Sequence, residues 1–213
     1  KTQSLQRLHE QLRHEIFHLW LPNGVNLTGR YDWFYEGFAL YQSLKTGAAT
    51  NRIRFEDMLD TLSQARNIDA VITPRRSLIE ASRERWSGAD TQLYARGMVT
   101  AFLADLVLLE RSNGKRSIET ILREIFAAYR PPAKPVDGNT AVLKRFEQLP
   151  ELAGVVADYI KGAKPIAWNS IIEGAGLEEG PGVPLRIKPK ISGKQKALLD
   201  KLGYNNWRKL TQQ

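Results

Sequence analysis

Cysteine is missing from this sequence, and its absence excludes several kinds of site at once. Disulfide frameworks, zinc fingers, thiolate nucleophiles and Cys-x-x-Cys redox sites all need cysteine. The compartment stays open on this evidence, because both cytoplasmic and exported proteins can lack cysteine. A periplasmic or otherwise exported location is slightly favoured over the cytoplasm.

Long hydrophobic runs are also missing. The most apolar stretch, Met98 to Leu109, is interrupted by Asp105 and is much shorter than the roughly 20 residues that a membrane-spanning helix needs. The sequence begins with a lysine, and no basic segment leads into an apolar run with a small-residue cleavage site. We therefore expect no membrane span, and a signal peptide that was removed or never existed. A chain of 213 residues is long enough to bury a core of its own.

Acidic residues are nearly absent from the end of the chain. Residues 185–213 contain eight Lys and Arg against one Asp, which is +7 of the net charge of +8. Such a basic tail can bind phosphates, and Trp207 can stack on bases, so nucleic-acid binding is one alternative function. The favoured interpretation is a solvated helical hairpin, with Ser192 capping a helix and with Trp207 and Leu210 packed on the body. Nucleic acid is therefore an unexpected partner.

What the sequence does contain is a His-Glu-x-x-His motif, His14 to His18, on a segment with helical periodicity. Residues four apart lie on one face of a helix, so His14 and His18 can bind the same metal ion. A catalytic zinc site adds a third protein ligand and keeps one position open for water. Glu15 lies on the same turn and can take the proton of that water without binding the metal. The motif predicts a zinc hydrolase.

Glu36 is the candidate third ligand. It lies in the run Trp-Phe-Tyr-Glu-Gly-Phe at 33–38, on a helix expected from Asp32, as N-cap, to about Lys45. A glutamate inside a helix is usually solvated, and a lone histidine is usually solvated or a satisfied core residue. Here the aromatic neighbours should be buried, and an unpaired charge among them would be costly. A bound metal ion would compensate the charge of Glu36.

One side of the first helix carries apolar residues at helical spacing: Leu5, Leu8, Leu12, Ile16 and Leu19. At about 100° per residue they fall within roughly 60° of one another, while His14 and His18 point to the opposite side. The apolar stripe and the histidines are therefore expected to serve different purposes. His9 lies nearer the leucines and is expected to be structural.

A third pattern, Tyr94-Ala95-Arg96-Gly97, lies in a nearly continuous apolar segment from about Asp90 to Arg111, which we expect to be the central core helix. Together with the histidine motif followed by Trp20, and with the run at 33–38, it resembles the gluzincins, the thermolysin-like zinc peptidases. Within them the glycyl aminopeptidase family is the most similar. The likeness continues more weakly to about residue 177 and leaves out the tail.

The resemblance implies a mainly α fold, the helical half of a thermolysin-like catalytic domain with a small basic C-terminal appendage. Residues 1–130 would form the zinc-binding catalytic helical lobe, residues 131–184 its helical continuation, and residues 185–213 the appendage. Further helices are expected at about 54–65, 74–85, 117–129, 140–148, 150–161 and 168–173. The mixed charges of the first two indicate solvated outer faces.

The resemblance also implies a function. One Zn²⁺ would be bound by His14, His18 and Glu36, with Glu15 as the general base and Tyr94 stabilising the oxyanion during hydrolysis of a peptide bond. The alternative for Tyr94 is an ordinary buried tyrosine. The alternative function is that of a protein whose zinc site is catalytically inactive and which acts by binding a partner.

Specificity for an N-terminal glycine is not carried over from the resemblance. In related aminopeptidases, the groups that hold the substrate's free amine come from a strand and loop upstream of the zinc helix, and thirteen residues precede His14 here. The chain is therefore expected to be the C-terminal piece of a longer protein or to dispense with that lobe. The peptide substrate and the oligomeric state are left open.

Overall fold

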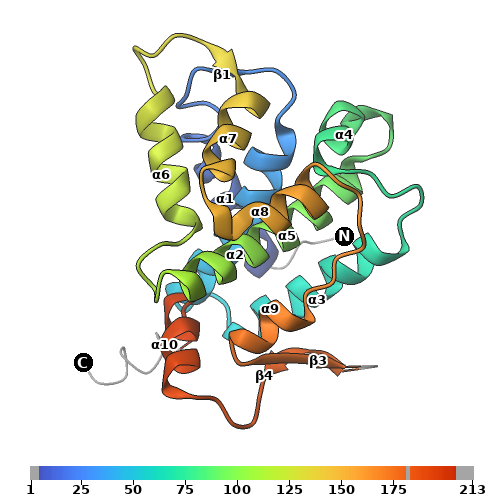
Figure 1. Cartoon of the computed structure of the whole chain (residues 1–213), viewed down its shortest axis with the longest axis vertical. Helices are drawn as coiled ribbons and strands as arrows, with labels where there is room; N and C mark the ends of the chain where they lie inside the picture. The colour runs from blue at the N-terminus through green and yellow to red at the C-terminus, as the bar shows by residue number, and fades with distance from the viewer. Residues whose placement is uncertain (1–4, 181–182, 205–213) are drawn as a thin grey trace.

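Helices make up most of the chain, which confirms the prediction of a mainly α fold (Figure 1). The computed structural model describes residues 5–180 and 183–204. The helices are α1 (Leu5–His18), η1 (Trp33–Gly37), α2 (Phe38–Ala49), α3 (Phe55–Val71), α4 (Leu78–Arg83), η2 (Arg85–Ser87), α5 (Asp90–Arg111), α6 (Ile118–Tyr129), α7 (Gly138–Glu147), η3 (Pro150–Leu152), α8 (Ala153–Val155), η4 (Val156–Ile160), α9 (Asn169–Gly174) and α10 (Gly193–Lys201).

The strands are short and form two separate pairs. β1 (Leu27–Thr28) runs parallel to β2 (Val136–Asp137), and β3 (Leu177–Gly180) runs antiparallel to β4 (Val183–Ile187). The first pair joins the loop after α1 to the proline-containing connection that precedes α7. The second pair is a hairpin with an irregularity between Glu178 and Gly180, and the sequence pattern did not indicate it.

α5 is the central core helix, as the sequence predicted, and α2, α3, α4, α9 and η1 pack around it. Among the described helices, it is the one with the length and hydropathy of a membrane span, but 89% of its most apolar window is buried inside the molecule. α3 buries Met58, Leu59 and Leu62 against this core, while Glu56 and Asp60 are exposed on the solvated outer face that the mixed charges indicated. One charged residue of α3, Asp69, is buried and pairs with Arg96 of α5.

Asp105, the acidic residue that interrupts the apolar run, fixes α2 onto α5. The Tyr41 hydroxyl donates to Asp105 Oδ2 at 2.6 Å, and Lys45 Nζ lies 2.7 Å from the same oxygen. The backbone N–H of Ile118, at the start of α6, donates to Oδ1 at 2.8 Å. A buried carboxylate that is paired and hydrogen-bonded in this way avoids the cost of an isolated charge. The cluster holds α2, α5 and α6 in one arrangement.

Two glycines allow η1 to cross α5 at very short range. A Cβ on Gly37 would lie 2.5 Å from the Cα of Gly97, and a Cβ on Gly97 would lie 2.9 Å from the Cα of Gly37. η1 is a π-helical turn, a wide turn that often occurs at functional sites. The crossing brings the residue before Gly37, which is Glu36, against the helix that carries Tyr94.

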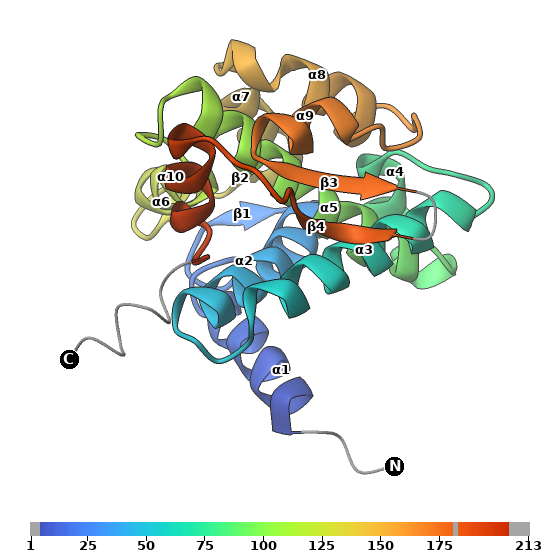
Figure 2. The ribbon, with the colours of Figure 1, turned by 90° about the horizontal axis from the view of Figure 1, so that it is seen from below.

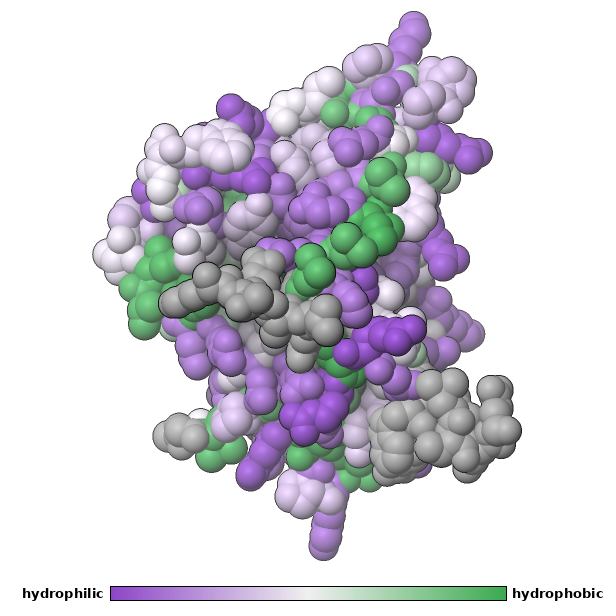
Figure 3. Space-filling view, turned by 180° about the vertical axis from the view of Figure 1, so that it is seen from behind, coloured by the Kyte–Doolittle hydropathy of each residue, from purple (hydrophilic) through white to green (hydrophobic). Residues whose placement is uncertain are grey.

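α1 turns its polar side toward the body and its apolar side outward. Leu8, Leu12, Ile16 and Leu19 are exposed by 46%, 55%, 46% and 67%. The start of α1 projects from the rest of the molecule (Figure 2). Seen from behind, the surface of the molecule carries a diagonal band of hydrophobic side chains (Figure 3). An amphipathic helix usually buries its apolar stripe. In the part of the chain that the structure describes, His14 is buried against α2 while the leucines face outward.

The basic end of the chain packs partly on the body. Ser192 caps α10, as predicted, by accepting a hydrogen bond from the Gln195 N–H at 3.2 Å. The Tyr204 ring lies 5.3 Å from the ring of Phe55. Trp207 and Leu210, which we expected to dock on the body, lie outside the described residues. The expected boundary between 184 and 185 falls inside β4, and the division into three parts stays a prediction.

Candidate metal centre

Three side chains from two segments meet at one point. α1 carries His14 and His18, while η1 carries Glu36, and the structure identifies these three as a group that can hold a metal ion. The two Nε2 atoms lie 2.9 Å apart. Glu36 Oε2 lies 3.1 Å from His14 Nε2 and 3.5 Å from His18 Nε2. The two histidines, four residues apart on α1, and the glutamate on η1 thus converge as the motif requires.

The geometry fits a tetrahedral metal site. With bonds of about 2.0–2.1 Å, neighbouring ligand atoms around zinc lie roughly 3.3 Å apart. The three observed separations lie on either side of that value. His18 Nδ1 is 2.9 Å from the carbonyl oxygen of Leu21, which can only accept, so Nδ1 carries the hydrogen. In neutral His18 the lone pair is therefore on Nε2, the atom that faces the cluster, and the backbone carbonyl holds the ring in that orientation.

The electrostatics of the cluster keep Glu36 ionised. Burial by itself would raise its pKa, but the hydrogen bonds from His14 and His18 and the positive charge of Arg85 outweigh burial and bring the pKa of Glu36 well below its usual range. For His18, burial lowers the pKa, but the hydrogen bonds to Glu36 and Leu21 outweigh it and raise the pKa. With both histidines neutral, the cluster offers an anionic oxygen and two imidazole lone pairs, a donor set that suits zinc.

Glu15 is exposed and does not belong to the cluster. It lines, together with His14, a cleft of about 370 Å³ whose other walls come from α2, α3 and α5. Its charge also contributes to the raised pKa of His18. A carboxylate that lies beside these three side chains, is open to solvent and borders a cleft is in a suitable position to exchange a proton with a molecule bound there.

Tyr94 lies beside Glu36. Burial raises its pKa to about 12, the Glu36 carboxylate adds to the rise, and Arg85 opposes it. The Tyr94 oxygen accepts a hydrogen bond from Arg85 Nη2 at 2.6 Å. The structure thus brings a hydroxyl from α5 to the edge of the metal cluster, although Tyr94 and the histidine motif are far apart in the sequence.

Sequence reasoning missed Arg85 and gave Asp32 the wrong role. Arg85 Nη1 lies 2.9 Å from Glu36 Oε1 and 2.9 Å from Asp32 Oδ1. Asp32 precedes η1, as expected, but its side chain makes no capping hydrogen bond and pairs with Arg85 instead. No spacing rule joins Arg85 to the motif, because the contact depends on how α4 and η2 fold back over η1.

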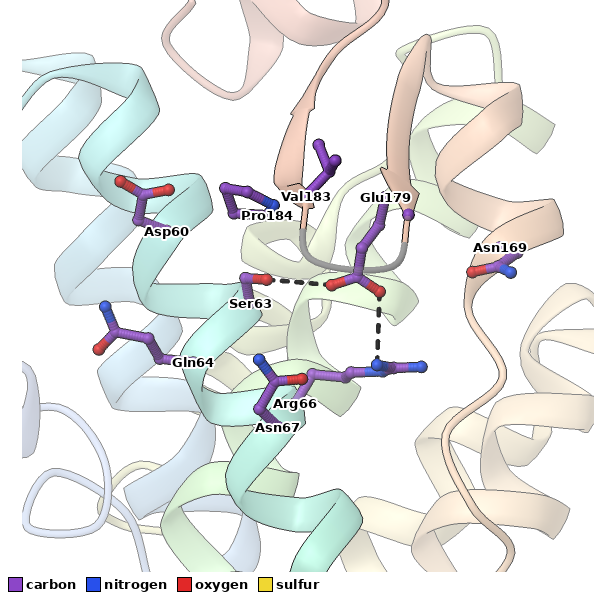
Figure 4. Close-up of a pocket in the computed structure, with 10 residues that line it drawn as sticks. Asp60, Ser63, Gln64, Arg66, Asn67, Asn169, Glu179, Val183 and Pro184 are labelled. Carbon is purple, nitrogen blue, oxygen red and sulfur yellow. Dashed lines mark hydrogen bonds and ion pairs between the residues drawn. The ribbon is translucent and has the colours of Figure 1, made fainter.

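A second cleft, of about 590 Å³, lies between α3 and the β3–β4 hairpin (Figure 4). Its central carboxylate, Glu179, accepts hydrogen bonds from Ser63 and from the Trp168 indole and pairs with Arg66. None of the predicted site residues lines it. The paired groups there attach the hairpin to α3, and the residues that the sequence predicted for a site lie elsewhere.

No profile of a known family matches the sequence, and no curated protein does. Among solved structures, the crystal structure of an aminopeptidase N family protein from Idiomarina loihiensis is similar, with a TM-score of 0.72 and 18% sequence identity. The similarity covers 83% of this chain and 35% of that protein, so the chain spans about a third of its length. This chain therefore has the fold of one part of an aminopeptidase N family protein.

Proposed function

We propose that this chain is the catalytic helical part of a zinc-dependent peptidase, of the aminopeptidase-like gluzincin kind. The observation that carries the proposal is the convergence of His14, His18 and Glu36 at ligand spacing, with Tyr94 beside them. The fold shared with part of an aminopeptidase N family protein supports it. The glycyl aminopeptidase family, which the sequence motifs resemble, is the proposed nearest relative.

His14, His18 and Glu36 would hold the zinc ion through the two Nε2 atoms and Oε2. When bound, the ion supplies a Lewis acid that polarises the peptide carbonyl and lowers the pKa of a water at the site. Each imidazole is presented by its neighbours: His18 by the Leu21 carbonyl, and His14 by burial against α2. The substrate would enter from the open side, where Glu15 lies.

Glu15 acts as the general base. Its carboxylate takes a proton from the attacking water and afterwards delivers that proton to the leaving amine. Tyr94 donates its hydroxyl hydrogen to the oxygen that becomes negative when the carbonyl is attacked. The products are two peptides, or an amino acid and a peptide.

The test is turnover of a peptide library by the zinc-loaded chain, with the full-length gene product assayed in parallel. We expect close to one zinc per chain by metal analysis and hydrolysis of peptide bonds. A protein that binds zinc but hydrolyses no peptide in either form would instead support the partner-binding alternative. A metal found away from the three ligands would contradict the site.

The variant Glu15→Gln tests whether Glu15 is the general base and not a metal ligand. We expect it to keep its zinc and to lose about 10²-fold or more in kcat, because an amide of nearly the same volume cannot accept the proton. The control is Glu56→Gln, which neutralises an exposed glutamate on α3 and should leave kcat unchanged. Equal turnover by Glu15→Gln and the unmodified chain would remove Glu15 from the mechanism.

A further inference from the structure

We propose that Arg85 is the positioning residue of this centre: it fixes which oxygen of Glu36 faces the metal and which way the Tyr94 hydroxyl points. The inference rests on the proposed function and adds a residue that the motifs do not contain. Arg85 belongs to η2, a short turn between α4 and α5, and its side chain is mostly buried. Its guanidinium contacts η1 through Glu36, α5 through Tyr94, and Asp32 just before η1.

The first part of the proposal concerns Glu36. Its Oε2 faces both histidines, whereas its Oε1 lies 2.9 Å from Arg85 Nη1. With Oε1 engaged, the carboxylate presents a single oxygen to the metal and cannot rotate to bind through both. Asp32, which is buried and 2.9 Å from the same Nη1, helps to hold the guanidinium in place. Arg85 thus holds Glu36 in the orientation of a one-oxygen ligand.

The second part concerns Tyr94. A guanidinium has donors but no acceptor, so the 2.6 Å contact from Arg85 Nη2 uses a lone pair of the Tyr94 oxygen. The hydroxyl hydrogen is thereby directed into the cluster, where the Glu36 carboxylate accepts it. The same hydrogen is the one that a donor to an oxyanion requires. Without Arg85 the hydroxyl could rotate, and its hydrogen would no longer be directed to one place.

The guanidinium is itself held firmly. Its carbon lies 4.7 Å from the centre of the Trp86 ring and 5.4 Å from that of Tyr94, within the range of cation–π attraction. Arg85 uses one nitrogen for the two carboxylates and another for the tyrosine. A lysine carries one nitrogen on a flexible stem, so it cannot reproduce this bridge.

Zinc affinity gives the first test, and it needs no turnover. In a competition titration with a chromophoric chelator, we expect Arg85→Met to bind zinc about 10-fold or more weakly than the unmodified chain, which is the usual effect of losing a group that orients a ligand. Arg85→Lys should lie between the two. The matched control is Arg76→Met, which breaks an ion pair with Glu84 on a neighbouring turn and should leave zinc affinity unchanged.

The second test is a double-mutant cycle at saturating zinc. We expect Arg85→Met to lower kcat about 10-fold with little change in KM, and to lower it no further in a Tyr94→Phe background, because coupled residues are not additive. If Arg85→Met does not fold, Arg85→Lys takes its place in the cycle. Zinc binding without hydrolysis by either this chain or the full-length gene product defeats the proposed function, while the zinc titration still decides the role of Arg85. Zinc affinity within twofold of the unmodified chain in Arg85→Met and Arg85→Lys, with additive effects on kcat, would overturn the inference.

Discussion

Tyr94 has one hydroxyl hydrogen, and the use of that hydrogen separates a catalytic tyrosine from an ordinary one. Its oxygen already accepts from Arg85, and the side chain is only partly buried, at the edge of the cluster. Its hydroxyl also hydrogen-bonds to Glu36, within the cluster itself, whereas the Tyr41 hydroxyl in the core donates to Asp105. The local contacts of Tyr94 favour a role in the site.

We expect Tyr94→Phe to lower kcat by about 10²-fold, since losing one donor to an oxyanion costs roughly 3 kcal/mol of transition-state stabilisation. The phenyl ring keeps the packing, so the melting temperature should change little. Tyr159→Phe is the control: its hydroxyl bonds to the Ala167 backbone, away from the cluster, and its loss should reduce stability without changing kcat. Full kcat together with a lowered melting temperature in Tyr94→Phe would mean that Tyr94 is an ordinary buried tyrosine without a role in catalysis.

At the scale of elements, the site depends on how closely η1 approaches α5. The wide turn of η1 and the two glycines place Glu36 near Tyr94, and both glycines were visible in the sequence patterns. The reason why each pattern contains a glycine could not be read from the sequence, since the spacing within each pattern does not indicate that the two glycines touch. The crossing gives the Gly of each pattern a physical explanation.

Gly37→Ala should therefore disturb both stability and metal binding. The new methyl would meet the Gly97 backbone at 2.5 Å, which no side-chain rotation can relieve, and overpacking of this kind costs about 1–3 kcal/mol. Urea unfolding and a zinc titration check the two effects. Gly154→Ala is the control, because its Cβ would meet nothing within 4 Å and its free energy of unfolding should be unchanged or slightly higher. Equal behaviour of the two variants would refute the close crossing.

A prediction for α1 tests whether its apolar stripe is exposed, as in the structure, or buried, as is usual for an amphipathic helix. Since Leu12 is exposed, Leu12→Ala should change the free energy of unfolding of this chain by less than about 0.5 kcal/mol. Leu62→Ala, at a fully buried position on α3, should cost about 2–5 kcal/mol. A large loss in Leu12→Ala, measured by urea unfolding, would mean that the stripe is buried and that α1 is turned the other way.

At the scale of the whole molecule, the Asp105 cluster connects three helices through charges. Burial by itself would raise the pKa of Glu119, but the charge of Lys45, 2.7 Å away, and the hydrogen bonds from Lys45 and Ser117 together outweigh it and lower that pKa. A carboxyl group with a lowered folded-state pKa contributes stability that is present above its unfolded pKa of about 4.3 and is lost as pH falls through the folded-state pKa.

The pH dependence of unfolding tests this contribution. At pH 7 we expect Glu119→Gln to be less stable than the unmodified chain by less than about 1 kcal/mol, because the carboxylate is partly exposed and screened by solvent. By pH 3 the difference should have become smaller, as Glu119 takes up its proton. Urea unfolding of both proteins at the two pH values, without metal, measures it. A difference that grows toward acid would have the wrong sign for this ion pair.

Local rules were enough to find several of the helices, the limits of α5 and the spacing of His14 and His18, since these depend on residues within a few turns of one another. The sequence also named Glu36 as the partner of the histidines, but the tertiary structure alone decided that the leucine stripe of α1 faces outward and that Arg85 joins Glu36 to Tyr94. Those contacts join residues far apart in the chain. Helical periodicity determines which side chains share a face, but only packing determines what that face meets.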